Sequence, residues 1–481
     1  MEKLNVCLIN DSFPPEIDGV ANAVTNYARL INAQHGSASV VTPSNPQADD
    51  SVFPFPVLRY PSVDMTKYVG YRAGMPFSPE ILRQVEEGGF DIIHSHCPIT
   101  STMLARVLRE RIDVPVVFTY HTKFDIDIAN AVRGKLLQEE AARILVENIS
   151  ACDEVWTVSN GAGENLCKLG YKGRYTVMPN GVDFPRGRVD DAFIAKATRS
   201  VDLPAGVPVF LFVGRMMWYK GIRIILDALK ALDAAGQDFR MVFIGGGTDK
   251  DEINAYAASL DLGGKVCFCQ PIHDRELIRA WYCRADLFLF PSTFDTNGLV
   301  VREAAACALG SVLIAGSCAA EDVTDGVNGF LIEENAESMA AKLLELCAAP
   351  EAMARIGAGA QRDIYMSWEQ AVDRAYARYF DVIDNYRRGL YPKHEKISDE
   401  MYKTMANYLD SAGRAREAQR RRAEELRRSY ESLVDGITGD RERLISEMRM
   451  NRDLVKDDLD ESRARLKERL DELTDRIDRF L

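Results

Sequence analysis

The sequence has no excess of positive charge, no membrane-spanning run and no recognisable leader. Its 59 lysines and arginines face 72 aspartates and glutamates, which gives a formal net charge of −13. Non-specific binding of nucleic acid needs a positive field, so we expect no nucleic-acid partner. No apolar run approaches the roughly 18 residues that cross a bilayer, and the first apolar run is only one strand long. These absences predict a cytoplasmic protein.

The sequence is also poor in metal-binding patterns. Its ten cysteines are scattered, none forms a CxxC pair, and only six histidines are present. Zinc sites usually appear in a sequence as closely spaced pairs of these two residue types. We therefore expect no zinc site, and we expect reduced thiols, as is usual in the cytosol.

What the sequence does contain is a repeated alternation of short apolar runs with stretches of helical spacing. In residues 1–190 the strand-like runs lie at 5–9, 40–41, 91–94, 114–119 and 154–158. In residues 205–366 they lie at 209–213, 240–244, 266–269, 287–290 and 312–315. Such alternation predicts parallel sheets covered by helices on both faces. We predict an α/β fold of two Rossmann-like, doubly wound domains, with residues 183–206 as the region that links them.

The C-terminal part of the chain has a different composition. Residues 367–388 predict one long helix, and from residue 391 to 481 glycine and proline nearly disappear while charged residues become dense. Within residues 440–481, apolar residues fall near the a and d positions of a heptad, with interruptions at Arg452 and Ser462. This all-helical tail is predicted to self-associate as a coiled coil or helical hairpin. A helix that packs on its own enzyme is an equal alternative.

The first candidate site is the segment NDSFPPEIDGV at residues 10–20, between the first strand and a helix. A glycine at position 19 lets the backbone approach a phosphate or sugar, and the helix start near Val20 favours negative charge. The segment is not GxGxxG, so a site for a nicotinamide dinucleotide is disfavoured. Taken alone, Asp18-Gly19 indicates only a turn.

The second candidate site follows the strand at residues 209–213. Arg215 and Lys220 stand there between Gly214 and Gly221. Doubly wound sheets bind ligands at the carboxyl ends of their strands, where arginine can grip a diphosphate with two donors and lysine adds a point charge. The alternative is a pair of solvated surface cations, which the flanking glycines disfavour.

The third candidate site is the segment DTNGLVVRE, from Asp295 to Glu303, after the strand at 287–290. Free amides near Gly298 and Leu299 would point at an anion from the start of the next helix. Glu303 could accept hydrogen bonds from ribose hydroxyls. Alternatively it only balances the helix dipole or pairs with a cation near Arg302.

The motifs NDSFPPEIDGV, DIIHSH, TYHT, MPNGVD, VGRMMWYKG, IGGG, FPSTFDTNGLVVREA and DGVNGFL, in this order, resemble those of glycosyltransferase family four. The resemblance covers roughly residues 4–388 and is specific because so many motifs occur in the right order. It implies the GT-B fold of two Rossmann-like domains, with the helix at 367–388 crossing back to the first domain. It also implies a nucleoside-diphosphate sugar donor, retention of anomeric configuration, no metal and no other cofactor.

The resemblance also implies roles for individual residues. Arg215 and Lys220, with the amides of Gly298 and Leu299, would neutralise the diphosphate. Glu303 would hold the ribose, and His121, which alone would more often be structural, would contact the transferred sugar. Asp295 takes the place of the family's first glutamate and is one methylene shorter. The remaining donor-binding residues implied are Gly19, Val20, Gly214, Gly246 and Asn297. Two further departures are Asp18-Gly19 in place of two glycines, and Cys269-Gln270-Pro271 where a glycine is usual.

The acceptor is indicated by the DGV and YHT forms and by residues 58–76, which look most like the diacylglycerol glucosyltransferase branch. We therefore expect hexose transfer, from UDP-glucose, to a membrane lipid such as diacylglycerol. The alternatives are a transferase for cell-surface polysaccharide or a mannosyl lipid, a weakly catalytic scaffold that uses the tail, and a sugar-nucleotide epimerase.

The tail carries a basic segment at residues 413–430, where seven arginines face three glutamates. A basic helix can attract anionic lipid headgroups, so this segment is predicted to hold the enzyme peripherally on the inner face of the plasma membrane. The alternative is a solvated helix with internal ion pairs, because the segment has few large apolar residues to insert.

Overall fold

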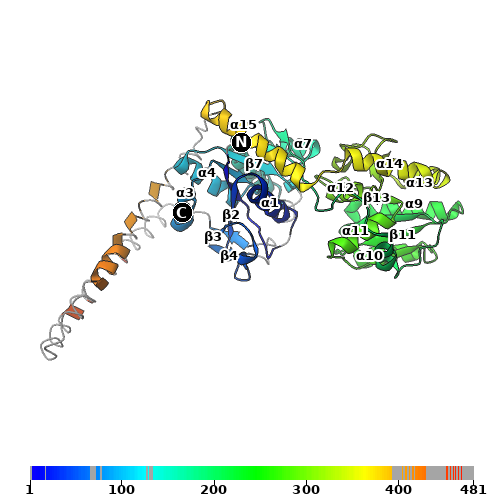
Figure 1. Cartoon of the computed structure of the whole chain (residues 1–481), viewed down its shortest axis with the longest axis horizontal. Helices are drawn as coiled ribbons and strands as arrows, with labels where there is room; N and C mark the ends of the chain where they lie inside the picture. The colour runs from blue at the N-terminus through cyan, green and yellow to red at the C-terminus, as the bar shows by residue number, and fades with distance from the viewer. Residues whose placement is uncertain are drawn as a thin grey trace. The chain divides into compact units, whose positions relative to one another are not determined.

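The computed structural model describes residues 3–16, 18–65, 72–75, 78–125, 128 and 134–392, and part of the tail, chiefly 418–428. The chain divides into two compact units, Met1–Asp410 and Ser411–Leu481, which are described separately (Figure 1). The larger unit contains two parallel sheets, and the predicted α/β fold class with two Rossmann-like domains is confirmed.

The first sheet has seven strands among the described residues, in the order β3-β2-β1-β6-β7-β8-β9, and every neighbouring pair is parallel. The strands are β1 (Asn5–Ile9), β2 (Ser37–Pro43), β3 (Val57–Tyr60), β6 (Ile92–Ser95), β7 (Val116–Tyr120), β8 (Glu154–Thr157) and β9 (Thr176–Val177). The helices are α1 (Gly19–Leu30), which runs into the π-helical turn η1 (Ile31–His35), α3 (Pro79–Glu87), α4 (Thr100–Ile112), α6 (Lys135–Ser150) and α7 (Asn160–Lys168). A short antiparallel pair, β4 (Ser62–Asp64) and β5 (Arg72–Gly74), stands beside it.

Both faces of the first sheet are buried, as the continuous apolar strands predict. Val6 and Leu8 of β1 belong to one hydrophobic cluster, while Cys7 and Ile9 belong to another. Successive side chains of a strand point to opposite faces, so the two clusters are the cores above and below the sheet. Helices therefore cover both faces, and ligands can reach the sheet only at the ends of its strands.

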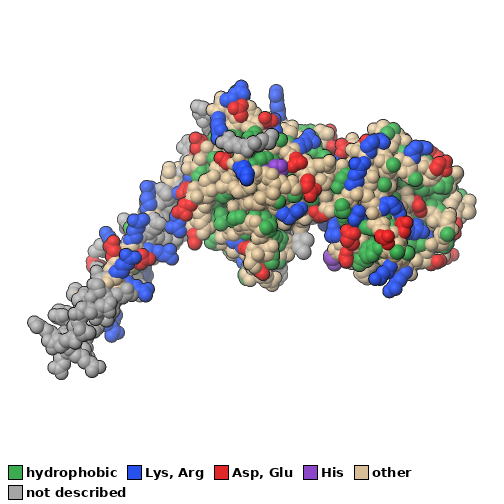
Figure 2. All heavy atoms as spheres, viewed as in Figure 1, with side chains coloured by type: hydrophobic (Ala, Val, Ile, Leu, Met, Phe, Trp, Pro, Cys, Tyr) green, Lys and Arg blue, Asp and Glu red, His purple; other side chains and the backbone are tan. Residues whose placement is uncertain are grey.

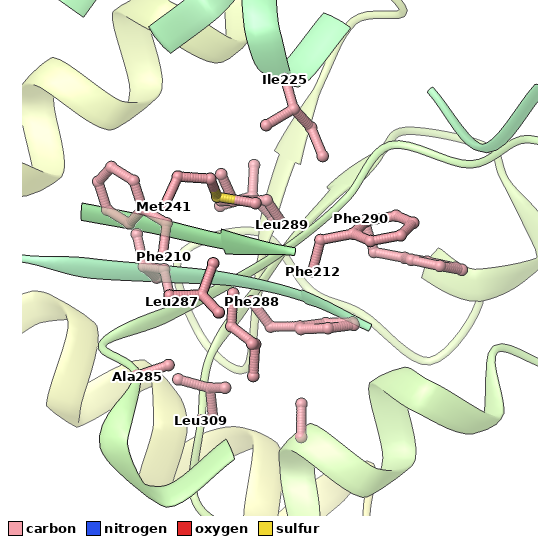
Figure 3. Packing of buried hydrophobic residues seen from close by; sticks show 14 of the residues in the cluster. Phe210, Phe212, Ile225, Met241, Ala285, Leu287, Phe288, Leu289, Phe290 and Leu309 are labelled. Carbon is pink, nitrogen blue, oxygen red and sulfur yellow. The ribbon is translucent and has the colours of Figure 1, made fainter. Parts of the chain in front are cut away.

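The second sheet has six described strands in the order β12-β11-β10-β13-β14-β15, again all parallel. The strands are β10 (Val209–Val213), β11 (Arg240–Ile244), β12 (Val266–Cys269), β13 (Leu287–Phe290), β14 (Ser311–Ile314) and β15 (Phe330–Ile332). The helices are α9 (Ile222–Ala234), α10 (Lys250–Ser259), α11 (Arg275–Arg284), α12 (Leu299–Ala306), α13 (Ala336–Ala348) and α14 (Pro350–Asp363). Phenylalanines of neighbouring strands fill its core, with the rings of Phe212 and Phe290 stacked at 6.0 Å (Figure 3).

The strand order of each sheet reverses next to its first strand. β1 lies between β2 and β6, and β10 lies between β11 and β13. At such a point the crossover connections leave in opposite directions and open a crevice at the carboxyl ends of the strands. The loops after β1 and β10, which carry two of the candidate sites, are therefore placed at these two crevices.

Residues 183–206, the predicted link between the two domains, are structured for much of their length. This segment contains helix α8 (Asp191–Thr198), whose first turn is capped by the Asp190 carboxylate. Phe184 and Ile194 are buried in the hydrophobic core of the second sheet. The segment is therefore part of the second domain, because its apolar side chains are needed to cover that core.

The helix predicted at residues 367–388 is α15 (Trp368–Arg387), which begins with a capping box at Ser367. Its buried face, including Trp368 and Tyr379, belongs to the same hydrophobic cluster as Val6 and Leu8. The Tyr376 hydroxyl accepts a hydrogen bond of 2.7 Å from the amide of Leu4. The chain thus returns from the second sheet to the first, as the resemblance implies.

The tail is described only in part. Residues 418–428 are helical and exposed. The rest of the segment predicted to meet the membrane, 413–430, and most of the segment predicted to self-associate, 440–481, lie outside the described residues; of the heptad positions only Leu459 is described, and it is exposed. No helix among the described residues is long and apolar enough to cross a bilayer.

Candidate active site

A cavity of about 480 Å³ lies where the carboxyl ends of strands from both sheets meet. The predicted site residues that line it are Gly19, Val20, His121, Gly214, Arg215, Lys220, Asp295, Asn297, Gly298 and Leu299. Two of the predicted residues, Gly246 and Glu303, are outside its lining. The structure therefore brings residues from four separate motifs of the sequence into one cavity.

Lys220 is the buried cation of this cavity and is only 7% exposed. Its Nζ lies 2.7 Å from Oδ2 of Asp295, and the Ser292 hydroxyl donates to the same oxygen at 2.7 Å. Lys220 ends a short 3-10 turn, and Gly221 follows it with φ +75°, where a Cβ would lie 2.0 Å from the Pro291 carbonyl oxygen. The close approach of these two loops, which only glycine permits, holds the cation and the acid together.

The start of helix α12 faces the same cavity. Gly298 is the N-cap residue, and no side chain caps the first amides, which belong to Leu299 and Val300. Exposed amides at a helix N-terminus carry partial positive charge and bind anions. Beside them, both polar atoms of the Asn297 amide are buried without a partner among the described residues. An unpaired buried polar group costs about 1–3 kcal/mol, so a polar ligand here would be favoured.

Glu303 lies on α12, outside the cavity lining, and its carboxylate is held from two sides. Arg275 donates to Oε1 at 2.7 Å, and the Tyr282 hydroxyl donates to Oε2 at 3.0 Å. The cation that pairs with Glu303 is thus Arg275 on α11, whereas Arg302 bonds to Asp322 and to the Ile364 carbonyl. The carboxylate is fixed and retains free lone pairs.

Gly246 lies in a glycine run that fixes the loop after β10. A Cβ on Gly245, where φ is +155°, would lie 1.9 Å from the carbonyl oxygen of Gly214. The Met216 amide donates to the Gly246 carbonyl at 2.9 Å. The loop that carries Arg215 is therefore braced by backbone contact with the loop after β11.

His121 lies at the end of β7 and is 8% exposed. Its Nε2 is 2.9 Å from Nδ1 of His96, and its Nδ1 is 3.5 Å from the side-chain amide nitrogen of Asn180. The Thr296 hydroxyl, from the second domain, donates to the His121 carbonyl at 2.8 Å. Burial lowers the pKa of His121 to about 4, so its imidazole is neutral at physiological pH.

The three buried histidines lead us to predict how the stability of the fold changes with pH. Burial lowers the pKa of His94, His96 and His121, whereas an imidazole in the unfolded chain titrates near 6.5. As the pH falls below about 6.5, the unfolded state takes up protons that the folded state does not, so the folded state loses about 1.4 kcal/mol per pH unit for each such group. We expect the thermal unfolding midpoint to fall steadily from pH 6.5 toward pH 4. Calorimetry should show a shallower slope for His121→Gln than for the wild type, and an unchanged slope would contradict the prediction.

Several cavity residues were missed by sequence reasoning. Asp18 caps α1 by accepting hydrogen bonds of 2.7 Å from the amides of Val20 and Ala21, and it lines the cavity. His96, Asn180 and Lys123 also line it. The signal for three of these was present, because they belong to the motifs NDSFPPEIDGV, DIIHSH and MPNGVD, while Lys123 directly follows TYHT.

Contacts between the two domains close around the cavity. Lys123 Nζ donates to the Thr293 carbonyl at 3.2 Å, close to the loop that carries Asp295. Farther out, the Glu321 carboxylate accepts hydrogen bonds from the amides of Asn160 and Gly161 at the start of α7. Both domains therefore contribute residues to one site.

Comparison with known proteins agrees with this geometry. A model described as Glycosyltransferase Family 4 matches residues 17–186, and one described as Glycosyl transferases group 1 matches residues 194–363. Two Rossmann-like domains that share one cavity, with a returning last helix, define the GT-B class of glycosyltransferases. The chain belongs to glycosyltransferase family four.

The names of individual relatives give different activities. The chain is 31% identical over 321 residues to D-inositol 3-phosphate glycosyltransferase of Geodermatophilus obscurus, covering 63% of this chain and 70% of that protein. It is 21% identical over 408 residues to alpha-monoglucosyldiacylglycerol synthase of Streptococcus pneumoniae, covering 84% of this chain and 91% of that protein. The crystal structure of Anabaena HepE in complex with UDP superimposes with a TM-score of 0.63 at 18% identity, covering 79% of this chain and 100% of HepE, which shows the shared fold.

Among the described residues, no group of three or more histidine, cysteine, aspartate or glutamate side chains is arranged to hold a metal ion.

Proposed function

We propose that the protein is a retaining, metal-independent hexosyltransferase that moves glucose from UDP-glucose to a membrane lipid such as diacylglycerol. The observation that carries this proposal is the buried Lys220 beside Arg215 and the uncapped start of α12, all on one cavity. Two cations and free helix amides together match a diphosphate. The UDP bound to HepE and the name of the S. pneumoniae relative support the choice of donor and acceptor.

In this proposal the protein acts mainly by electrostatics. When the sugar leaves the donor, negative charge develops on the diphosphate while the sugar gains cationic character. Arg215, Lys220 and the amide of Leu299 would stabilise that charge, and Lys220 and the amide would do so without reorganising, because the fold already holds them in place. Glu303 would accept from the ribose hydroxyls, and His121 and Asp295 would contact the transferred sugar. Contact between the domains would exclude water and limit hydrolysis of the donor.

A transfer assay tests the reaction and the acceptor together. Purified protein would receive a panel of labelled nucleotide sugars with a bacterial lipid extract, and the label would be followed into the organic phase. We expect label from UDP-glucose to enter a lipid. Transfer of label to a water-soluble acceptor would favour a polysaccharide or a polyol phosphate, the second being the class named by the more identical relative. A protein that consumes no donor would be a scaffold.

We also propose that the tail attaches the enzyme peripherally to an anionic membrane surface. The helical residues 418–428 contain five arginines and two glutamates, and all are exposed. Cationic side chains are dense on this part of the chain in Figure 2. Each such cation near an anionic surface contributes about 1 kcal/mol. This segment would therefore bring the enzyme to its lipid acceptor.

Replacing Arg421 and Arg422 by glutamine in the full chain should weaken binding to anionic vesicles about 30-fold, since two contributions of about 1 kcal/mol are lost. Co-sedimentation with phosphatidylglycerol vesicles measures the change. A matched control is Lys230→Gln, which removes an exposed cation from α9. Equal binding by the double variant and the control would reject the attachment.

A further inference from the structure

A column of aromatic rings connects the returning helix α15 to the active site. The ring of Tyr379 stacks on Trp156 with centroids 5.4 Å apart, and Trp156 lies 5.0 Å from His94. The rings of His94 and His96 are 4.0 Å apart, and those of His96 and His121 are stacked at 5.2 Å. The Trp156–His94 contact is edge-to-face and the other contacts are stacked or tilted, so rings from α15, from β8 and from the ends of β6 and β7 form one continuous series of contacts.

His94 is fixed at both of its nitrogens. Its Nδ1 lies 2.6 Å from the Tyr379 hydroxyl, and its Nε2 lies 2.7 Å from the Thr119 hydroxyl. The side chain is fully buried. A ring held at two points cannot turn, so His94 forms a rigid wall for the histidine that packs against it.

His96 has a different arrangement, with a single polar contact. Its Nδ1 is 2.9 Å from His121 Nε2, while its own Nε2 is buried without a partner among the described residues. His94 packs on one side of the ring, and Tyr27 lies 5.5 Å from it in an edge-to-face contact. Among the described residues, the His96 ring therefore has its one polar contact with His121.

We propose that His96 is a positioning residue for sugar transfer, which holds the imidazole of His121 in one orientation and one tautomer. A neutral imidazole has one N–H, so the hydrogen bond between the two rings couples their protons. The Asn180 side-chain nitrogen is a donor, so His121 Nδ1 is the acceptor in that contact. The His121 proton is then on Nε2, which donates to His96 Nδ1.

This inference rests on the proposed function, because there His121 contacts the transferred sugar. Rate depends on the placement of such a group, and a displacement of about 1 Å can cost roughly 100-fold. The column supplies the rigidity, since His96 is packed against a ring that is itself fixed by Tyr379 and Thr119. Through His96, the packing of α15 on the first sheet thereby fixes the position of His121 on the sugar side of the cavity.

Two substitutions distinguish the roles of the two ring nitrogens of His96. In His96→Asn the side-chain amide takes roughly the place of Nδ1 and keeps a partner for His121. In His96→Gln it takes roughly the place of Nε2 and loses that partner. Asparagine is one methylene smaller than glutamine, so His96→Asn loses more packing than His96→Gln, and a larger effect of His96→Gln cannot come from packing.

The first measurement is nitrogen-15 NMR of histidine-labelled full-length protein, which requires no turnover. The chain has six histidines, so each imidazole can be assigned by substitution. We expect a scalar coupling across the hydrogen bond between His96 Nδ1 and His121 Nε2 in the wild type. We also expect a single His121 tautomer in the wild type and in His96→Asn, and a mixture in His96→Gln. Absence of the coupling, or an unchanged tautomer in His96→Gln, would overturn the proposal; the wild-type coupling decides it even if His96→Gln does not fold.

The second measurement is steady-state kinetics. His96→Gln should lower kcat roughly 10- to 100-fold with the donor KM little changed, and His96→Asn should stay within a few-fold of wild type. Equal losses in the two variants would indicate a packing role and overturn the proposal. If no donor is consumed by the wild type, the proposed function fails, while the NMR result still decides whether His96 orients His121.

Discussion

Replacing Lys220 by methionine is expected to lower kcat by roughly 100- to 1,000-fold, the loss typical for one group that stabilises developing negative charge. The affinity for the donor should fall much less, because the ground-state diphosphate is also held by Arg215 and the amides of α12. Methionine keeps the length of the buried stem and removes only the charge. Steady-state kinetics and calorimetric titration with UDP measure the two effects separately.

The same substitution leaves Asp295 without its cation, so stability must be measured in parallel. The pair is largely buried, with side-chain exposures of 8% for Lys220 and 23% for Asp295. Removing one partner of a buried pair is more costly than removing both. Adding Asp295→Asn should therefore restore part of the melting temperature but none of the kcat. Equal losses in kcat and donor affinity would contradict the assigned role, and Lys230→Met on α9 is the matched control.

Replacing Glu303 by glutamine is expected to weaken donor binding about 100-fold. Each hydrogen bond to a charged group contributes about 1.5–3 kcal/mol, and the ribose offers two hydroxyls to this carboxylate. Glutamine has the same shape, but its amide has only one acceptor oxygen. It must also face Arg275 and Tyr282, which both donate to Glu303. We expect kcat to change less than the dissociation constant.

Comparing UDP with a nucleotide that lacks both ribose hydroxyls measures the contact between Glu303 and the ribose. Wild type should bind 2′,3′-dideoxy-UDP far more weakly than UDP, and Glu303→Gln should bind the two nearly equally. The control Tyr282→Phe removes one support of the carboxylate without removing the charge, and should cost no more than about tenfold. If Glu303→Gln discriminates between the two nucleotides as strongly as wild type does, the carboxylate does not hold the ribose.

The sequence by itself determined the fold class, because local apolar runs such as Val209–Val213 are long enough to be buried strands and are separated by helical spacing. It also determined where Arg215 and Lys220 would lie, since a loop that follows a strand of a parallel sheet must emerge at the carboxyl edge. The helix within the predicted link at residues 183–206 was not expected from the sequence, for the opposite reason. The short helix α8 has no strong local signal, and its burial depends on the core that it covers.

Only the tertiary structure decided which side chains meet. Lys220 pairs with Asp295 across 75 residues, His96 contacts His121 across 25, and the Thr296 hydroxyl reaches the His121 carbonyl across 175. Contacts between residues this far apart in the sequence leave no local pattern from which they could be predicted. They become contacts because the strand order places the ends of β6, β7, β10 and β13 at the crevices of the two sheets, and because α15 returns the chain to the first sheet. The motifs pointed to ten of the residues that line the cavity, but their pairing depended on how the sheets are wound.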